Sequence, residues 1–372
     1  MFVYLFGFFL SLFFVYLSQK NVGKISSFLI VLGIVIPCAI AGFRDPSIGT
    51  DVQVYVKPLF ERAKESANFL EYYNSNIYYY SWRADPVKTF EIGYLVLNYI
   101  IAKLFGVLWV MLFAIHAIII IPLYKALKLY SNKFPLWIGM ATFYFMFYNR
   151  SLNVMRQWMA LSLLFYAFHY LQNKNYLKYS IFVLFSILFH NSAVVGFGIM
   201  LIYIYVNNKQ DSIRIFNVFI IIGIGLACLL GTDIIVNILV RIGIVEYSSY
   251  ISGDVSFLPS QIILRFPLII LFVYDWRRLK SIEKDAYIYL IFVIFDILTS
   301  QLSSVNQVSG RIALFFSMYN ILIYPQICTV SKFKNNNYVR TVYLMGYLFL
   351  YWWVQYVYMG YNATVPYISI FQ

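Results

Sequence analysis

The sequence predicts an all-α polytopic membrane protein with about 12 transmembrane helices, and two observations lead to this fold class. Of its 372 residues, 62% are hydrophobic and only 12% are charged, which is too apolar for a soluble domain. Apolar runs of about 15 to 20 residues also recur along the chain, and in hydrocarbon such a run satisfies its backbone only as a helix. We therefore interpret residues 1–372 as a single integral membrane domain.

The first apolar run, residues 2–17, lacks the basic start and the small-residue cleavage site of a signal peptide, so it is predicted to be a retained helix. Cys38, Cys228 and Cys328 are scattered in apolar surroundings without a CxxC pair, which argues against disulfides and a metal cluster. The predicted spans are 2–17, 25–43, 107–124, 134–149, 152–171, 176–189, 193–206, 214–230, 260–276, 285–300, 310–327 and 339–358.

Lysine is concentrated in short segments between alternate spans, which hold 16 of the 28 basic residues, 12 of them lysines. By the positive-inside rule these segments are cytoplasmic, and both termini and the long loop after the second span then lie outside. The net charge of +13 is explained in this way without a nucleic-acid partner. The lysine-rich segments are 18–24, 125–133, 172–178, 207–214, 277–285 and 331–340.

The long outer loop covers residues 44–106, and its polar stretch 43–91 carries 7 of the 15 acidic residues of the chain. Apolar and charged side chains at helical spacing predict an amphipathic helix over 57–70, lying in the headgroup plane. Residues 91–105 are apolar but short for a crossing, at about 1.5 Å per residue. If residues 91–105 crossed the membrane, the alternation of sides along the chain would also place the lysines of 125–133 outside. They are predicted to form an interfacial or re-entrant helix.

Arginine replaces lysine on the outer and embedded side, which has eight arginines and four lysines. The forked guanidinium binds phosphate oxygens in bidentate fashion, and a charge inside an apolar span usually marks a ligand or ion path. A lipid-linked phosphate or pyrophosphate is the simplest such ligand, although snorkelling to phospholipid headgroups explains the pattern too. The arginines are Arg44, Arg62, Arg83, Arg150, Arg156, Arg241, Arg265 and Arg311.

Three residues on the predicted outer side are candidates for acid–base chemistry. His190 lies at the tip of a hairpin whose lysines, Lys178 and Lys209, are predicted to be cytoplasmic. Asp51 follows the turn at Gly49, where a carboxylate either serves the turn or acts as general base for a sugar hydroxyl. Glu91 is either a helix N-cap or first-turn acid, or the second carboxylate of the site. No carboxylate pair or histidine cluster calls for a metal or another cofactor.

Several motifs resemble the EpsG family, whose members are Wzy-type polymerases of capsule, exopolysaccharide and O-antigen. Val52 stands where the family usually has a tyrosine after GTD, so of that aromatic pair only Tyr55 carries over. The resemblance implies functional roles for Arg44, Asp51, Arg156, Gln157, His190 and Arg311, and we add Arg150 and Arg265 to the expected pyrophosphate-binding set. The motifs are IGTDVQVY (48–55), EIGYLVLNYIIAKLFG (91–106), NVMRQWMALSLLFYAFHYL (153–171), FSILFHNSA (185–193), GRIALFF (310–316) and VPYISIF (365–371).

The segment at 91–106 also resembles polyprenol-dependent GT-C glycosyltransferases, in which an amphipathic first periplasmic loop with an acidic residue precedes a short in-plane helix. Together the resemblances imply a bacterial inner-membrane enzyme that joins oligosaccharide repeats on undecaprenyl diphosphate at the periplasmic face. Its expected partners are these lipid-linked substrates, membrane lipids and a chain-length regulator. A lipid-linked oligosaccharide flippase stays open, although it would show two related halves. A polysaccharide ligase or single-sugar GT-C transferase also stays open.

Overall fold

The computed structural model describes residues 1–78, 84–207, 211–230, 257–304, 309–331 and 334–371. Among these residues the chain is helical apart from one short hairpin, and its contacts divide it into two compact units. Unit 1 comprises Met1–Val194 with Met345–Gln372, and unit 2 comprises Val195–Leu344. The prediction of a single integral membrane domain describes how the chain inserts into the bilayer, and it stays a prediction.

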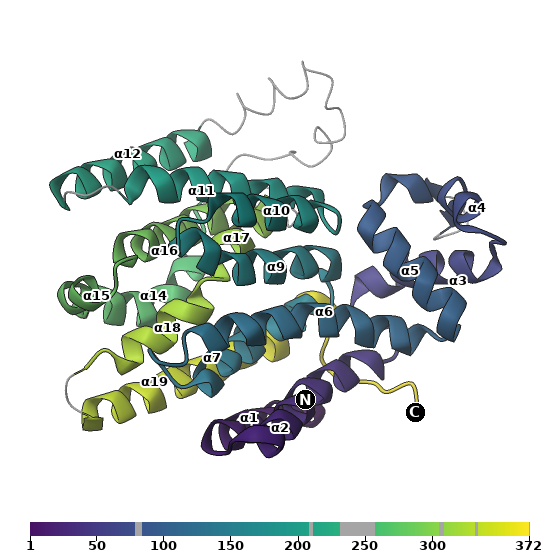
Figure 1. Cartoon of the computed structure of the whole chain (residues 1–372), viewed down its shortest axis with the longest axis horizontal. Coiled ribbons are helices and arrows are strands. Elements are labelled where there is room, and N and C mark those ends of the chain that lie inside the picture. Colours follow the sequence, from purple (N-terminus) through teal and green to yellow (C-terminus); the bar gives the residue numbers. More distant parts are fainter. Residues whose placement is uncertain (79–83, 208–210, 231–256, 305–308, 332–333, 372) are drawn as a thin grey trace. The chain divides into compact units, whose positions relative to one another are not determined.

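Unit 1 is built on long apolar helices that pack side by side, α1 against α2 and α6 against both α2 and α9 (Figure 1). Its core is aromatic, because the ring of Phe8 contacts those of Tyr144, Tyr148 and Trp352. The bounds are α1 (Phe2–Lys20), α2 (Gly23–Gly42), α6 (Leu108–Leu129), α7 (Leu136–Phe143), η3 (Tyr144–Tyr148), α8 (Asn149–Ser151), α9 (Met155–Gln172), α10 (Tyr176–Ile187), η4 (Asn191–Val194), η8 (Trp353–Tyr358) and η9 (Tyr361–Ala363).

Unit 2 is centred on α16, which contacts α12, α14 and α17. Among its buried polar side chains is Asp296, which forms a bidentate ion pair with Arg265, with both nitrogen–oxygen distances at 3.0 Å. The bounds are α11 (Val195–Val206), α12 (Asp211–Leu230), α14 (Pro259–Tyr274), α15 (Trp276–Ile282), α16 (Ala286–Ser300), η6 (Gln301–Ser304), η7 (Ser309–Ala313), α17 (Leu314–Ser317), α18 (Asn320–Thr329) and α19 (Lys334–Trp352), the last of which continues into unit 1.

Four described helices are long and apolar enough to cross a membrane, namely α1, α2, α6 and the segment Ala286–Ser303. A fifth results if Gly310–Ser317 and Asn320–Thr329, which are bent by 43°, form one span. Helices also occur in the other predicted spans, but several are short: α10 and α11 have 12 residues each. The structure therefore supports a helical chain with several membrane spans, whereas the number of 12 stays a prediction.

The outer loop folds as two short helices, a hairpin and a third helix, all within unit 1 (Figure 1). The predicted helix over 57–70 is divided, because α3 ends at Glu65 and α4 (Phe69–Tyr73) begins a new helix. Asn68, the N-cap of α4, accepts a hydrogen bond from the backbone of Glu71, and Glu71 accepts one from the backbone of Ala67, so side chains cap the new helix on both sides of its start. The remaining bounds are η1 (Val52–Val56), α3 (Lys57–Glu65), β1 (Asn76–Tyr78), β2 (Ala84–Pro86), η2 (Val87–Thr89) and α5 (Ile92–Phe105).

The apolar face of α3 is buried inside the protein. Leu59, Phe60 and Ala63 have no exposed surface, and α3 packs against α5. A neighbouring helix thus covers this face, and the position of the helix in the headgroup plane stays a prediction. Helix α5 has 14 residues and ends at Phe105, and the capping residue Gly106 has a φ of +67°, which suits glycine. A short helix was predicted here, and its depth in the membrane stays a prediction.

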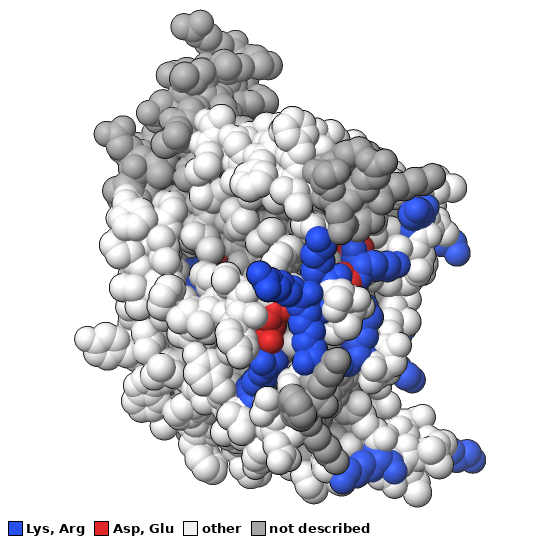
Figure 2. Space-filling model, turned by 90° about the vertical axis from the view of Figure 1, so that its left-hand side faces the viewer, with Lys and Arg blue, Asp and Glu red and all other residues white. Residues whose placement is uncertain are grey.

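Basic side chains dominate the charged residues on the face drawn in Figure 2. In unit 2, α15 carries Arg277, Arg278 and Lys280, and Arg340 of α19 forms an ion pair with Asp275 at 3.0 Å just before α15. Two of the predicted cytoplasmic segments, 277–285 and 331–340, are therefore neighbours within this unit. Their side of the membrane stays a prediction.

Candidate functional site

The site is built where the start of α5 meets the turn after α10. The first backbone N–H groups of a helix lack partners within it, and here Gly93 and Tyr94 donate to the carbonyl of Leu188 at 2.8 and 3.3 Å. A Cβ on Gly93 would lie 2.7 Å from the oxygen of Leu188, so the approach requires glycine. This contact places Glu91, the residue before α5, against the turn that carries His190.

Glu91 occupies the centre of the site, and its side chain is 6% exposed. Its Oε2 accepts a short hydrogen bond from Nη1 of Arg156. Its Oε1 accepts from the backbone N–H of Asn191 at 3.2 Å and lies 4.0 Å from Nδ1 of His190. One carboxylate therefore ties the outer loop, the start of α9 and the turn after α10 together.

The hydrogen bonds of His190 define its tautomer. The backbone N–H of Ser192 donates to Nδ1 at 3.2 Å, and the hydroxyl of Ser192 lies 2.8 Å from the same atom. Since a backbone N–H can only donate, Nδ1 is an acceptor and the neutral ring carries its proton on Nε2. The side chain is 24% exposed, so His190 can present an N–H donor to a ligand.

The guanidinium of Arg156 is held in a box of aromatic rings. Its carbon lies 4.6 Å from the ring centre of Tyr55, 4.9 Å from that of Phe90 and 5.9 Å from that of Tyr94. Such stacking suits the flat guanidinium and fixes its plane. Its Nε has no hydrogen-bond partner among the described residues. The rings and Glu91 thus orient a charged donor whose side chain is 21% exposed.

Asp51 reaches the site through Tyr55, whose hydroxyl donates to Oδ2 of Asp51 at 3.0 Å. Burial raises the pKa of the Tyr55 hydroxyl well above its ordinary value, and the nearby Asp51 raises it further, so Tyr55 remains a proton donor. Asn153 fixes this loop, because its Oδ1 accepts from the backbone of Asp51 at 2.9 Å and from the hydroxyl of Thr50 at 3.1 Å. The GTD motif is therefore docked on the turn before α9.

Asp51, Glu91 and Arg156 form one cluster, because all three lie within electrostatic range of Tyr94, and His190 joins it at 4.0 Å from Glu91. Arg44 lies beside it and donates through Nη2 to the sulfur of Met155 at 3.2 Å. Gln157 is buried in the first turn of α9, and Arg150 is half-buried in α8.

For the other predicted anion-binding arginines, a role at this cluster stays a prediction. Arg265 and Arg311 lie in unit 2, and Arg265 has a partner of its own in Asp296. The side chain of Arg62 forms ion pairs with Glu65 and Glu71 in the outer loop. Arg83 and Arg241 lie outside the described residues. Within the described residues, no three His, Cys, Asp or Glu side chains are grouped so that they could hold a metal ion.

Three residues of the site were not predicted from the sequence as parts of it. Phe90 and Tyr94 complete the aromatic box, and Asn153 anchors the GTD loop. A signal was present for both aromatic residues, since Phe90 directly precedes Glu91 and Tyr94 lies within the quoted motif 91–106. Nothing in the spacing of Asn153 indicates that it contacts a residue about 100 positions earlier, because that contact depends on the fold.

Gly93→Ala is expected to separate Glu91 from the His190 turn, because the added Cβ would overlap the carbonyl and side chain of Leu188 at 2.7 and 2.8 Å. We expect a loss of about 1–3 kcal/mol of stability and slower turnover. Thermal unfolding of the purified protein in detergent measures the first effect. Gly346→Ala is the matched control, since its Cβ would meet nothing within 4 Å. Equal melting temperatures for the two variants would contradict this prediction.

The chain was compared with known proteins. A sequence profile of the EpsG family matches residues 27–369, which is nearly the whole chain. Neither the comparison with curated proteins nor the comparison with solved structures finds a match. Members of the EpsG family are Wzy-type polysaccharide polymerases. The resemblance predicted from the motifs is confirmed, and the chain belongs to the EpsG family.

Proposed function

We propose that this polymerase joins oligosaccharide repeat units carried on undecaprenyl diphosphate, at the periplasmic face of the inner membrane. The observation that carries the proposal is the cluster around Glu91, in which an oriented arginine, a histidine donor and a second carboxylate meet in one place. A glycosyl transfer in which a diphosphate leaves needs such groups, because the leaving diphosphate requires a cation and a donor, and the acceptor hydroxyl requires a base. The membrane spans and the polymerase family of the chain agree with a lipid-linked substrate.

In the proposed reaction, a hydroxyl of the acceptor repeat attacks the anomeric carbon of the donor chain. A new carbon–oxygen bond forms, and the bond from the anomeric carbon to the diphosphate oxygen breaks with its electron pair. Negative charge therefore develops on undecaprenyl diphosphate as it leaves. Arg156 is oriented by its aromatic box and by Glu91 to stabilise that charge, and the Nε2–H of His190 supplies a neutral donor beside it.

Asp51 is the proposed base that takes the proton of the acceptor hydroxyl. Glu91 is less suited to this role, because Arg156 and the backbone of Asn191 engage both of its oxygens. Asp51 is half-buried and receives one hydrogen bond from Tyr55, which orients the carboxylate. We therefore propose that Glu91 positions Arg156 and the His190 turn.

Deletion of the gene in its host tests the proposed function. Loss of a polymerase is expected to leave surface glycans capped with a single repeat unit, and plasmid-borne wild-type protein should restore long chains. Lipid-bound polymer in the deletion strain would instead indicate a ligase. Repeat units confined to the inner leaflet would indicate a flippase. Either of these last two results would overturn the proposal.

A further inference from the structure

Arg44 is a fully buried cation whose donors are largely unused. It follows directly after α2 and has no exposed surface. Nη2 donates to the sulfur of Met155 at 3.2 Å, and a thioether is a weak acceptor. Nε and Nη1 have no hydrogen-bond partner among the described residues. Buried polar groups are normally paired, so this side chain is expected to have a further partner.

The neighbours of Arg44 do not fill that role. The hydroxyls of Tyr4, Tyr148 and Tyr367 donate to backbone carbonyls at 2.8, 2.6 and 3.0 Å, and none of these three oxygens accepts a hydrogen bond from Nε or Nη1 of Arg44. None of the ion pairs between described residues includes Arg44. Burial lowers the pKa of its guanidinium, as expected for a cation without a carboxylate. An anion from outside the chain would supply the missing partner.

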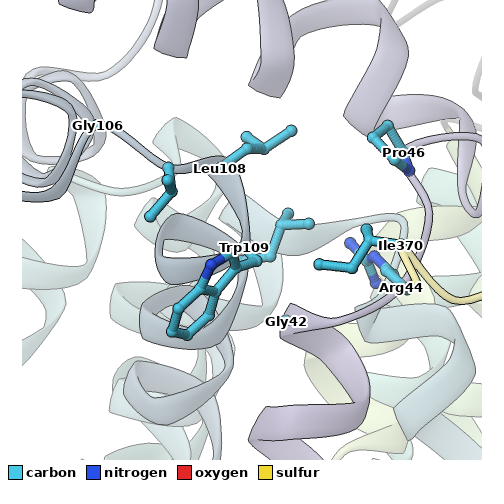
Figure 3. Close-up of a pocket in the computed structure, with 9 residues that line it drawn as sticks. Gly42, Arg44, Pro46, Gly106, Leu108, Trp109 and Ile370 are labelled. Atoms are coloured by element: carbon cyan, nitrogen blue, oxygen red, sulfur yellow. The ribbon is translucent and has the colours of Figure 1, made fainter.

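A pocket of about 290 Å³ lies beside this side chain within unit 1. Figure 3 shows Arg44 next to Ile370 and Pro46 on one side, with Leu108 and Trp109 on the other. The wall near Arg44 is fixed by backbone pairing, because the N–H of Ile370 donates to the carbonyl of Phe43 at 3.0 Å. Apart from Arg44 and the indole N–H of Trp109, the lining side chains are apolar, so the pocket suits an anion that is attached to a hydrocarbon chain.

We propose that the Arg44 pocket binds the phosphate of an isoprenoid-linked substrate, as an anion subsite separate from that of Arg156. Assigning it to a substrate rests on the proposed function, because an enzyme that joins two lipid-linked chains must hold two lipid phosphates. The two guanidiniums are suitably placed for this. Met155, which contacts Arg44, is the residue before Arg156, and Tyr55 lies within electrostatic range of both arginines.

Native mass spectrometry of the full chain in detergent tests the proposal by counting bound farnesyl diphosphate. Two molecules are expected on the wild type. Arg44→Met should retain one, because loss of the charged donors weakens that subsite by about 10- to 100-fold. Its melting temperature should equal or exceed that of the wild type, since an apolar side chain replaces an unpaired buried charge. Lys24→Met removes one cation at the opposite end of α2 and should still bind two.

Leu108→Trp keeps Arg44 and fills the pocket from the other side, so it should also bind one molecule even if Arg44→Met does not fold. Two molecules on Leu108→Trp, or two on a folded Arg44→Met, would overturn the proposal. Inorganic pyrophosphate and phosphatidylglycerol test whether the pocket binds a lipid-linked substrate, a free anion or a bulk lipid headgroup. An equal effect of Arg44→Met on pyrophosphate would indicate a free anion, and displacement by phosphatidylglycerol at equal concentration would indicate a bulk lipid headgroup. Either result would overturn the assignment to a substrate.

The variant Arg156→Met distinguishes a failure of this proposal from a failure of the proposed function. It should lose one molecule while the Arg44 pocket keeps the other. If Arg156→Met still binds two and Arg44→Met binds one, the pocket stands and the role of Arg156 in the proposed function fails. If Arg44→Met binds two and Arg156→Met binds one, the pocket proposal fails and the proposed function stands.

Discussion

Arg156→Lys is expected to slow polymer formation by about 100- to 1,000-fold, the usual effect of removing one preorganised donor that stabilises developing charge. Lysine keeps the charge, but it cannot stack flat between Tyr55 and Phe90, at 4.6 and 4.9 Å from the guanidinium. It also cannot donate to Glu91 and to a phosphate from one rigid fork. The rate is measured with purified protein in nanodiscs and a lipid-linked repeat unit as substrate, with products separated by chain length.

The matched control is Arg62→Lys, which makes the same change in the outer loop. Arg62 forms two ion pairs at 3.7 Å with Glu65 and Glu71, and pairs of this kind on the surface contribute only about 0–1 kcal/mol. We expect its polymer length and rate to match those of the wild type. Wild-type polymer from Arg156→Lys would remove Arg156 from the diphosphate site.

Hydropathy predicts where the helices of this chain occur, but it does not predict where they break. The run 57–70 has helical spacing throughout, yet Asn68 and Glu71 form hydrogen bonds that start a second helix. The run 310–327 is mostly apolar, yet the chain bends by 43° between Ser317 and Asn320. Such breaks depend on side-chain hydrogen bonds and on packing against neighbours, which an average over about 18 residues does not contain.

The candidate site was predictable to the extent that charge is rare in an apolar chain. Asp51, Glu91, Arg156 and His190 were selected from their residue types and motifs, and the structure places them in one cluster. The pairing of Arg265 with Asp296 could not be predicted, because both are single charges in separate apolar runs. A buried arginine on a ligand path and one in an ion pair look alike until their neighbours are known.

Asp51→Asn is expected to reduce the rate of polymer formation by about 100- to 10,000-fold, the range that removal of a general base covers. The amide oxygen of asparagine can still accept the hydrogen bond of Tyr55, and the backbone N–H of residue 51 can still donate to Asn153. The loop should therefore keep its conformation, and the loss can be assigned to the missing base. Rates are measured in nanodiscs with the lipid-linked repeat unit, and thermal unfolding verifies the fold.

Asp45→Asn supplies the matched control, six residues earlier on the same loop. Hydrogen bonds from Ser47 hold the pKa of the Asp45 carboxyl below its ordinary value, which is the behaviour of a turn residue, and asparagine serves such turns equally well. We expect Asp45→Asn to polymerise at the wild-type rate. If Asp51→Asn also keeps that rate while Glu91→Gln loses it, Glu91 is the base. The pairing of Glu91 with Arg156 would then have to open when the acceptor binds, since a carboxylate held by an arginine is a poor proton acceptor.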